Sequence, residues 1–253
     1  MDRYFKLLRQ NTLLYALPIS YDLLSFFLGT FLMGFWGAST LSIKLALQPG
    51  LPSVAPILEH NVLANGISLT HPQGGFVFLT FLFLLLVGAF LQAGYIGWLL
   101  EVTRGNKLSR GIFLSSGWRF WLRMLMVSLF LLMLSFMGLF AAEHLGGYGV
   151  VLVMLGIASF RVCFIFWEFT IVAENLSAGD GFFRCLQYFR RQTPATVWII
   201  GYLLLLGLGF GLFVNFIWHP ITVFATIFAY NFSAAGLQLA LMHSFMQIEI
   251  QEF

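Results

Sequence analysis

The side chains most able to do chemistry in this sequence are polar residues that interrupt long apolar stretches. They are Asp22, Gln92, Arg161, Glu168 and Asn231. A charge at the centre of a bilayer costs about 2.5–3.5 kcal/mol on insertion scales, so such residues in membrane proteins usually pair or mark a site. Two alternatives follow. The five line a polar cavity open to the cytoplasm, or they form an interhelical clamp in which Arg161 is satisfied by Glu168 or Asp22.

Arg161 and Glu168 are seven residues apart and fall on one face of the same predicted helix. In a straight helix they would lie about 10 Å apart along the axis, at 1.5 Å per residue. That separation is long for a direct ion pair within one helix. The sequence therefore leaves the partner of Arg161 open.

Other arrangements of reactive residues lack the spacing that chemistry needs. Neither cysteine, Cys163 or Cys185, has a CxxC partner, and no G-x-S-x-G nucleophile elbow occurs. No HxxxH or HExxH pair occurs either. We therefore expect no catalytic, cofactor or metal site, and no enzymatic activity. The histidines on or beside the predicted outer face are His60, His71, His144 and His219.

Six apolar stretches must position the polar side chains. Of the 253 residues, 60% are hydrophobic and 9% are charged, whereas soluble domains carry about 25% charged residues. This composition excludes a soluble globular protein and a disordered one. A membrane span needs about 20 mostly apolar residues. The sequence predicts one all-α transmembrane domain over residues 1–253, with spans at 19–35, 76–100, 121–142, 150–172, 197–217 and 221–242.

The cations predict an orientation for these spans. Six spans place both termini and the second and fourth connections on one side, and 11 of the 13 Lys and Arg residues fall there. The positive-inside rule makes that side cytoplasmic, so we expect N-in and C-in. Topology then accounts for the net charge of +3, and nucleic-acid binding is not needed to explain it. The 11 residues are Arg3, Lys6, Arg9, Arg104, Lys107, Arg110, Arg119, Arg123, Arg184, Arg190 and Arg191.

Two segments on the predicted cytoplasmic side have the pattern of amphipathic helices. In the first, around residues 3–10, aromatic and leucine side chains face away from Arg3, Lys6 and Arg9, as in helices that lie in the headgroup plane. In the second, residues 180–191, a polar stripe opposes Phe182, Leu186 and Phe189. This second helix is either an interfacial connector or a coupling helix that docks a cytoplasmic partner. Its contact candidates are Arg184, Arg190 and Arg191.

Residues 76–142 and 150–217 form a weak internal repeat with an offset of 70 residues. Val102 matches Val172, and Gly111–Phe113 matches Gly181–Phe183. The pattern predicts two parallel copies of a helix–loop–helix unit, which are common in transporters and also build passive scaffolds.

The longest connection, residues 37–75, lies on the predicted outer side. Its apolar stretch from Pro56 to Ile67 suits a surface or re-entrant helix. A connection of this length often has a role. It either caps the bundle or meets an external partner.

The segment from Glu174 to Trp198, E-N-L-S-A-G-D-G-F-F-R-C-L-Q-Y-F-R-R-Q-T-P-A-T-V-W, is a basic amphipathic loop that precedes a span. It resembles the corresponding loop of bacterial six-span families of poorly defined function. These are the YciC-like proteins, the DUF975 and DUF4013 groups, and the membrane domain of some glycerophosphodiester phosphodiesterases. The opening from Tyr4 to Pro18 is also similar to their starts. The resemblance implies a multi-pass protein of the bacterial cytoplasmic membrane without a catalytic site.

Two functions fit these observations. The first is a non-enzymatic membrane component that acts as a scaffold or accessory subunit, with the lipid bilayer and other membrane or membrane-associated subunits as partners. The alternative is a small transporter or channel whose polar cavity lies in the cytoplasmic half of the bundle.

Overall fold

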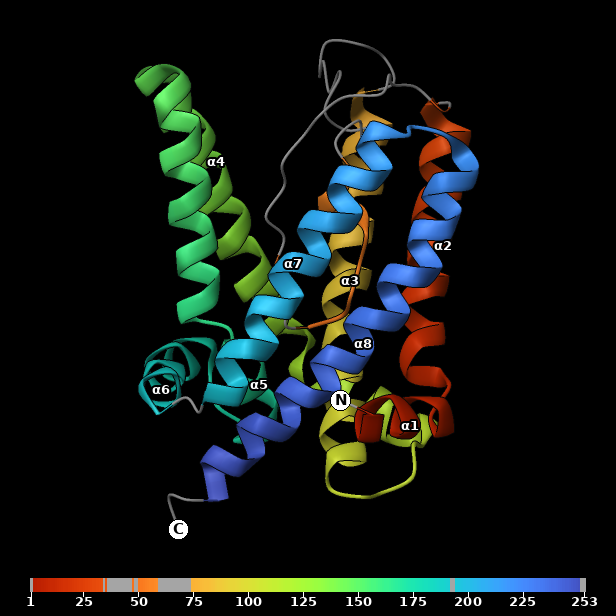
Figure 1. Ribbon diagram of the computed structural model, residues 1–253, viewed down its shortest axis with the longest axis vertical. Coiled ribbons are helices and arrows are strands. Elements are labelled where there is room, and N and C mark those ends of the chain that lie inside the picture. The colour runs from red at the N-terminus through yellow and green to blue at the C-terminus, as the bar shows by residue number, and fades with distance from the viewer. Residues whose placement is uncertain are drawn as a thin grey trace.

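The computed structural model describes residues 2–33, 35, 47, 50–58, 74–191 and 194–250, and within these it contains helices and no strands (Figure 1). A turn of two residues, 11 and 12, separates the short helix α1 from the long helix α2. The next long helix, α3, begins at Gly74, after the longest connection. The elements in chain order are α1 (Asp2–Gln10), α2 (Leu13–Met33), the 3-10 turn η1 (Ala55–Ile57), α3 (Gly74–Thr103), α4 (Arg110–Cys163), α5 (Trp167–Ala173), α6 (Ala178–Arg190), α7 (Pro194–Phe216) and α8 (Pro220–Ile250).

Among the described residues, six helical stretches are long and apolar enough to cross a membrane. They are Leu13–Phe31, Leu82–Thr103, Arg110–Gly138, Val151–Ala173, Pro194–Phe216 and Pro220–Ile248. This confirms the prediction of an all-helical protein with six spans, and the chain is a multi-pass membrane protein in a lipid bilayer. The first span begins six residues earlier than predicted, because α2 continues through Pro18. Proline is tolerated in membrane helices when its surroundings satisfy the freed backbone groups.

Helix α4 contains one span and the first part of the next, which continues into α5, and it folds back on itself. Its 54 residues would extend about 81 Å in a straight helix. Instead, a Cβ added to Gly138 would lie 2.7 Å from Cγ1 of Val153, so residues fifteen apart in the chain touch. Figure 1 shows α4 turning at the end farthest from α6. The predicted spans 121–142 and 150–172 are therefore the two arms of one helical hairpin.

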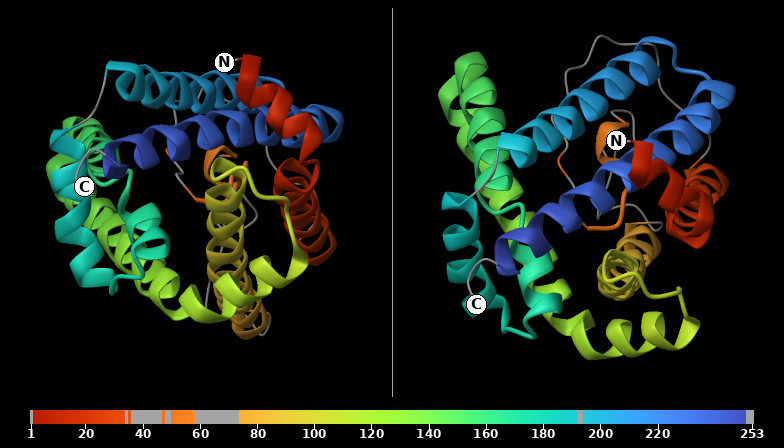
Figure 2. Two further views of the ribbon diagram at one scale, coloured as in Figure 1. Left: turned by 90° about the horizontal axis from the view of Figure 1, so that it is seen from below. Right: turned by 60° about the horizontal axis from the view of Figure 1, so that its bottom comes forward.

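The cationic segments and both chain ends lie at the same end of the bundle. Figure 1 places α1, the α3–α4 connection, α6 and the N and C termini together there. The view from below shows α1 lying beside α8 rather than running along the bundle axis (Figure 2). The Phe5 ring stacks on Phe232 of α8 at 5.9 Å and lies against Gly236. One face of α1 is therefore packed against α8.

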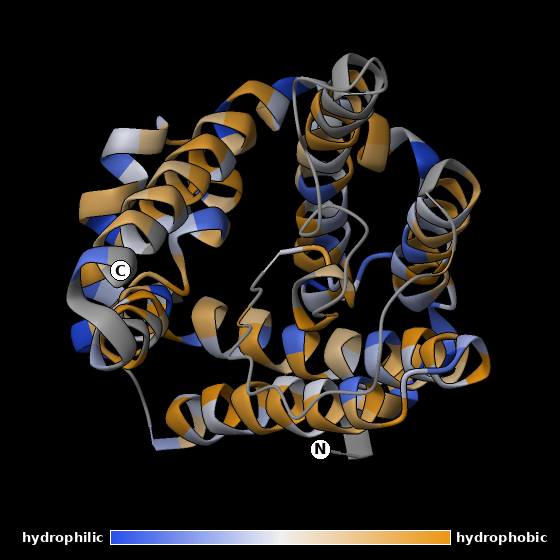
Figure 3. Ribbon diagram, turned by 90° about the horizontal axis from the view of Figure 1, so that it is seen from above, coloured by the Kyte–Doolittle hydropathy of each residue, from blue (hydrophilic) through white to orange (hydrophobic). Residues whose placement is uncertain are grey.

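Many large apolar side chains face outward. In the α4 hairpin, Met133, Phe136 and Phe140 are 56%, 62% and 65% exposed. Figure 3 shows apolar residues predominating along the long helices. Exposed apolar surface of this extent marks a membrane or protein contact. On the long helices this surface extends along the membrane-spanning stretches.

A tryptophan at the cationic end of α3 fixes the connection that follows. The Trp98 indole N–H donates to the Ser109 carbonyl oxygen at 2.8 Å, and its ring lies 4.6 Å from the Phe113 ring. This contact ties the end of one span to the first turn of the next helix.

A second tryptophan makes the same contacts at the start of α5. Trp167 donates to the Ala178 carbonyl oxygen at 2.8 Å, and its ring lies 5.2 Å from Phe182. In both cases the carbonyl lies eleven residues after the tryptophan and the aromatic ring fifteen. The two sets of contacts are related by an offset of 69 residues, one fewer than the offset of the sequence match.

Replacing Trp98 or Trp167 with Phe keeps most of the ring and removes the N–H. We expect each substitution to lower the free energy of unfolding by about 0.5–1.5 kcal/mol, because a partly buried carbonyl loses its donor. Thermal unfolding in detergent, followed by size-exclusion chromatography, measures the loss. The control is Trp198→Phe, at a side chain that is 69% exposed. An equal loss in the control would contradict a specific role for the two tethers.

Candidate functional site

A non-helical segment lies inside the bundle. This inserted segment consists of Leu47 and residues 50–58. Leu47, Val54 and Ile57 are 5%, 3% and 0% exposed. Figure 1 shows residues 50–58 lying between α3 and α7, while α2 ends and α3 begins at the end opposite to the cations. The prediction of a re-entrant helix over Pro56 to Ile67 extends mostly beyond the described residues, and the described part is inserted as an irregular chain with one 3-10 turn.

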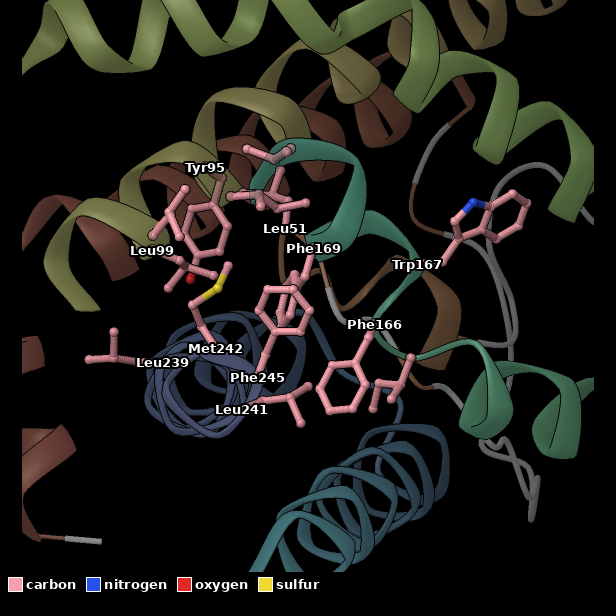
Figure 4. Packing of buried hydrophobic residues seen from close by; sticks show 14 of the residues in the cluster. Leu51, Tyr95, Leu99, Phe166, Trp167, Phe169, Leu239, Leu241, Met242 and Phe245 are labelled. Atoms are coloured by element: carbon pink, nitrogen blue, oxygen red, sulfur yellow. The ribbon is translucent and has the colours of Figure 1, made fainter. Parts of the chain in front are cut away.

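The tip of the inserted segment packs into the main apolar core. Leu51 is 8% exposed and belongs to the same buried cluster as Tyr95, Phe169 and Phe245. Figure 4 shows these side chains from α3, α5 and α8 around the position of Leu51. The segment therefore fills the space between helices that are distant in the sequence.

Irregular backbone at membrane depth needs hydrogen-bond partners, because no bulk water is present to supply them. Asp22 of α2 provides the first. Its Oδ2 accepts the Val54 backbone N–H at 2.9 Å, and its Oδ1 accepts the Ser53 hydroxyl at 2.5 Å. Asp22 is 2% exposed. One carboxylate thus holds two consecutive residues of the inserted segment.

The same carboxylate joins α2 to the last span. The Asn231 side-chain amide of α8 donates to Oδ2 of Asp22 at 2.6 Å. Asn231 is fully buried. Asp22 and Asn231, predicted independently as candidates, are therefore brought together. Ser53, their partner in the inserted segment, was not predicted, because a serine between two prolines carries no hydropathy signal.

A second amide holds the far part of the segment. Asn215 of α7 is fully buried and donates through Nδ2 to the Ile57 carbonyl oxygen at 2.9 Å. Sequence reasoning missed Asn215. The signal was available, since Asn215 interrupts an apolar span in the same way as Asn231.

Arg161 holds the beginning of the segment. Its Nε donates to the Leu47 carbonyl oxygen at 3.2 Å, and its Nη1 lies 3.0 Å from Oε1 of Glu168. Glu168 is fully buried. Glu168 is one of the two partners that the clamp alternative named for Arg161, and the separation of about 10 Å expected in a straight helix does not apply. The helix is interrupted between Cys163 and Trp167, so the chain turns and Glu168 comes back toward Arg161.

Gln92 of α3 lies beside the segment at Gly50. A Cβ added to Gly50 would lie 2.8 Å from Cδ of Gln92. The five predicted residues therefore fall into three places: Asp22 with Asn231, Arg161 with Glu168, and Gln92 alone. A member of each group contacts the inserted segment, and the Arg161–Glu168 contact is one of the two that the clamp alternative named.

Helix α6 carries two of the three predicted contact candidates, Arg184 and Arg190, and the third, Arg191, is its C-cap. Arg184 lies 3.3 Å from Glu174 and 5.1 Å from the Tyr188 ring centre, so it is part of an internal network. Arg190 and Arg191 are exposed. The buried face of α6 consists of Gly181, Cys185 and Tyr188. That face is shifted by one residue from the predicted Phe182, Leu186 and Phe189, because the small Gly181 packs against Ile171 and Thr170 of α5.

Burial, together with the nearby Glu168 carboxylate, raises the pKa of the Cys185 thiol to about 12. Cys185 therefore stays protonated at neutral pH, and its thiol is unreactive, since the thiolate is the nucleophile. Within the described residues no three His, Cys, Asp or Glu side chains gather into a metal-binding group. His60 and His71 lie outside the described residues.

Comparison with protein-family models, with curated proteins and with solved structures found no match to this chain. The resemblance to bacterial six-span families therefore stays a prediction.

Arg161→Leu tests whether the Arg161–Glu168 pair is a structural clamp. The substitution leaves a buried carboxylate without its partner, which costs about 3–5 kcal/mol. We expect loss of monodisperse folded protein, measured by size-exclusion chromatography after mild heating. The double variant Arg161→Leu/Glu168→Leu should recover part of the loss, because no lone charge remains buried. Normal abundance and stability of Arg161→Leu would contradict the clamp, and Arg190→Leu serves as the exposed control.

Proposed function

We propose that this multi-pass protein is a non-enzymatic component of the bacterial cytoplasmic membrane that acts as a scaffold or accessory subunit of a larger assembly. One observation carries the proposal. Polar side chains inside the bundle bond the inserted segment and one another, as Asp22, Asn215 and Arg161 do. Groups that serve as internal supports favour a fixed architecture over a reaction or a moving cargo.

The proposed orientation is N-in and C-in. The end of the bundle that holds α1, α6 and both termini also holds the cationic connections (Figure 1), and cationic loops remain in the cytoplasm. In this orientation α1 and α6 lie at the inner headgroup layer, where amphipathic helices bind anionic lipid. The matched Trp98 and Trp167 contacts support the further proposal that residues 76–142 and 150–217 are two copies of one unit.

The proposed contact surface for another subunit is the C-terminal turn of α6. Arg190 and Arg191 are exposed there, whereas Arg184 is occupied by Glu174 and Gln187. Cations at the rim of an interface act mainly through long-range attraction and set the rate of association. Because both side chains are exposed, substitutions at Arg190 and Arg191 probe binding at the surface of the protein.

A scaffold should co-purify with a protein partner at a constant ratio. We expect Arg190→Glu/Arg191→Glu to lower that ratio about tenfold, through reversal of two charges at the contact. Quantitative mass spectrometry of affinity-purified native membranes measures it. The control is Lys6→Glu, an exposed cation of α1 at the same end of the bundle. A partner ratio unchanged in the double variant would exclude α6 as the contact, and the absence of any stoichiometric partner would contradict the scaffold.

A second candidate function is a small transporter or channel. It is favoured by Glu168, whose Oε2 is buried without a hydrogen-bond partner in the described part of the chain. Ionisable groups at membrane depth often mark solute or proton pathways. A pathway of this kind requires water to reach the polar residues from one side of the membrane.

Cysteine labelling separates the two functions. In a Cys163→Ser background, Ser53→Cys places a thiol beside Asp22, and Cys185 is silent because its thiol stays protonated. A scaffold predicts no reaction of this thiol with a membrane-impermeant reagent, because Ser53 is only 7% exposed. The control Ser115→Cys, at an exposed position of α4, should react in open membranes. Reaction at residue 53 would favour the transporter.

A further inference from the structure

An open cleft of about 450 Å³ lies at the cationic end of the bundle. One wall is the connection between α1 and α2, and the other is the connection between α3 and α4. The lining residues are Leu7, Gln10, Asn11, Thr12, Leu13, Val102, Gly105, Asn106, Lys107 and Leu108. We propose that this cleft binds the phosphate-bearing headgroup of an anionic phospholipid, and this inference stands independently of the scaffold function.

The lining is divided between polar and apolar groups. Gln10, Asn106 and Lys107 supply hydrogen-bond donors, and Lys107 also supplies a positive charge. Leu7 and Leu13 supply apolar contact. A phospholipid has the same division, with a phosphodiester above and the glycerol and first acyl carbons below. The volume lies within the range of about 300–1,000 Å³ that is typical of small-molecule sites.

The position of the cleft places it at the membrane surface. Helix α2 begins at Leu13, and α3 ends at Thr103, so two spans meet the aqueous side here. A phosphate bound at this depth has its acyl chains directed along the membrane helices.

The charge at the cleft favours an anion. The ten lining residues include Lys107 and no Asp or Glu. The carboxylate of Glu101 is engaged by Asn106 at 2.6 Å and by Arg104 at 3.4 Å. Lys6 and Arg9 of α1 are exposed at the same end of the bundle. Each cation near an anionic surface contributes about 1 kcal/mol of attraction.

A lipid fits this cleft better than a soluble phosphate compound does. The apolar residues Leu7, Leu13, Val102 and Leu108 make up four of the ten lining residues, and a free phosphate would gain nothing from them. Anionic lipid also gives the cytoplasmic leaflet a negative surface that attracts basic residues. The proposal therefore commits to the lipid, and soluble phosphate is an outcome of the test.

Native mass spectrometry of the full chain tests the proposal, with phosphatidylglycerol as the probe. The detergent-solubilised protein should retain one phosphatidylglycerol in preference to phosphatidylcholine. Lys107→Gln should weaken retention about fivefold, the factor expected for one cation at an anionic surface. Thr12→Trp, at an exposed residue of the lining, fills the cleft without changing its charge and should weaken retention as well. Arg190→Gln, outside the cleft, should leave retention unchanged.

Three results would overturn the proposal. Equal losses in Lys107→Gln and Arg190→Gln would mean general attraction of the cationic end for lipid. Equal retention of phosphatidylcholine would mean no preference for an anionic headgroup. Binding of glycerol 3-phosphate as tightly as phosphatidylglycerol would mean a soluble phosphate site. Size-exclusion profiles of each variant establish that it is folded, and Thr12→Trp decides the outcome should Lys107→Gln fail to fold.

Discussion

The architecture depends on hydrogen bonds to a backbone segment that is not helical inside a membrane protein. Helices satisfy their own N–H and C=O groups, whereas an irregular chain at membrane depth must find donors and acceptors elsewhere. Asp22 supplies an acceptor to Val54, Asn215 a donor to Ile57, and Arg161 a donor to Leu47. Burying these polar residues in the membrane costs free energy. The same residues supply the hydrogen bonds that the backbone of the inserted segment requires.

This constraint explains why polar residues from several helices, rather than from one, contact the inserted segment. The inserted segment passes Arg161 of α4, then Asp22 of α2, and then Asn215 of α7. Asn231 of α8 completes the shell of Asp22. Each side chain meets the segment at a different place, so the helices are cross-linked through a shared central element as well as through their direct contacts.

The sequence was sufficient to predict the parts of the fold that follow from long-range composition. Six spans and the shared location of the cations follow from hydropathy and charge over tens of residues. The inserted segment could not be predicted, because Leu51 and Ile57 look equally suited to a surface helix. The Arg161–Glu168 pair was one of two alternatives for Arg161, and the sequence could not choose between them. Its geometry depends on a break of a few residues between α4 and α5, which a helical periodicity does not reveal.

The contact between Asp22 and Asn231 has a consequence for biosynthesis. The two residues are 209 positions apart, and membrane proteins are inserted in the order in which the ribosome makes them. Helix α2 enters the bilayer long before its amide partner exists, and the growing chain carries an incompletely solvated carboxylate through most of translation. A chain that ends before α8 has Ser53 and Val54 as partners for Asp22 and lacks the amide of Asn231, so the carboxylate acquires its full set of hydrogen bonds only with the last helix.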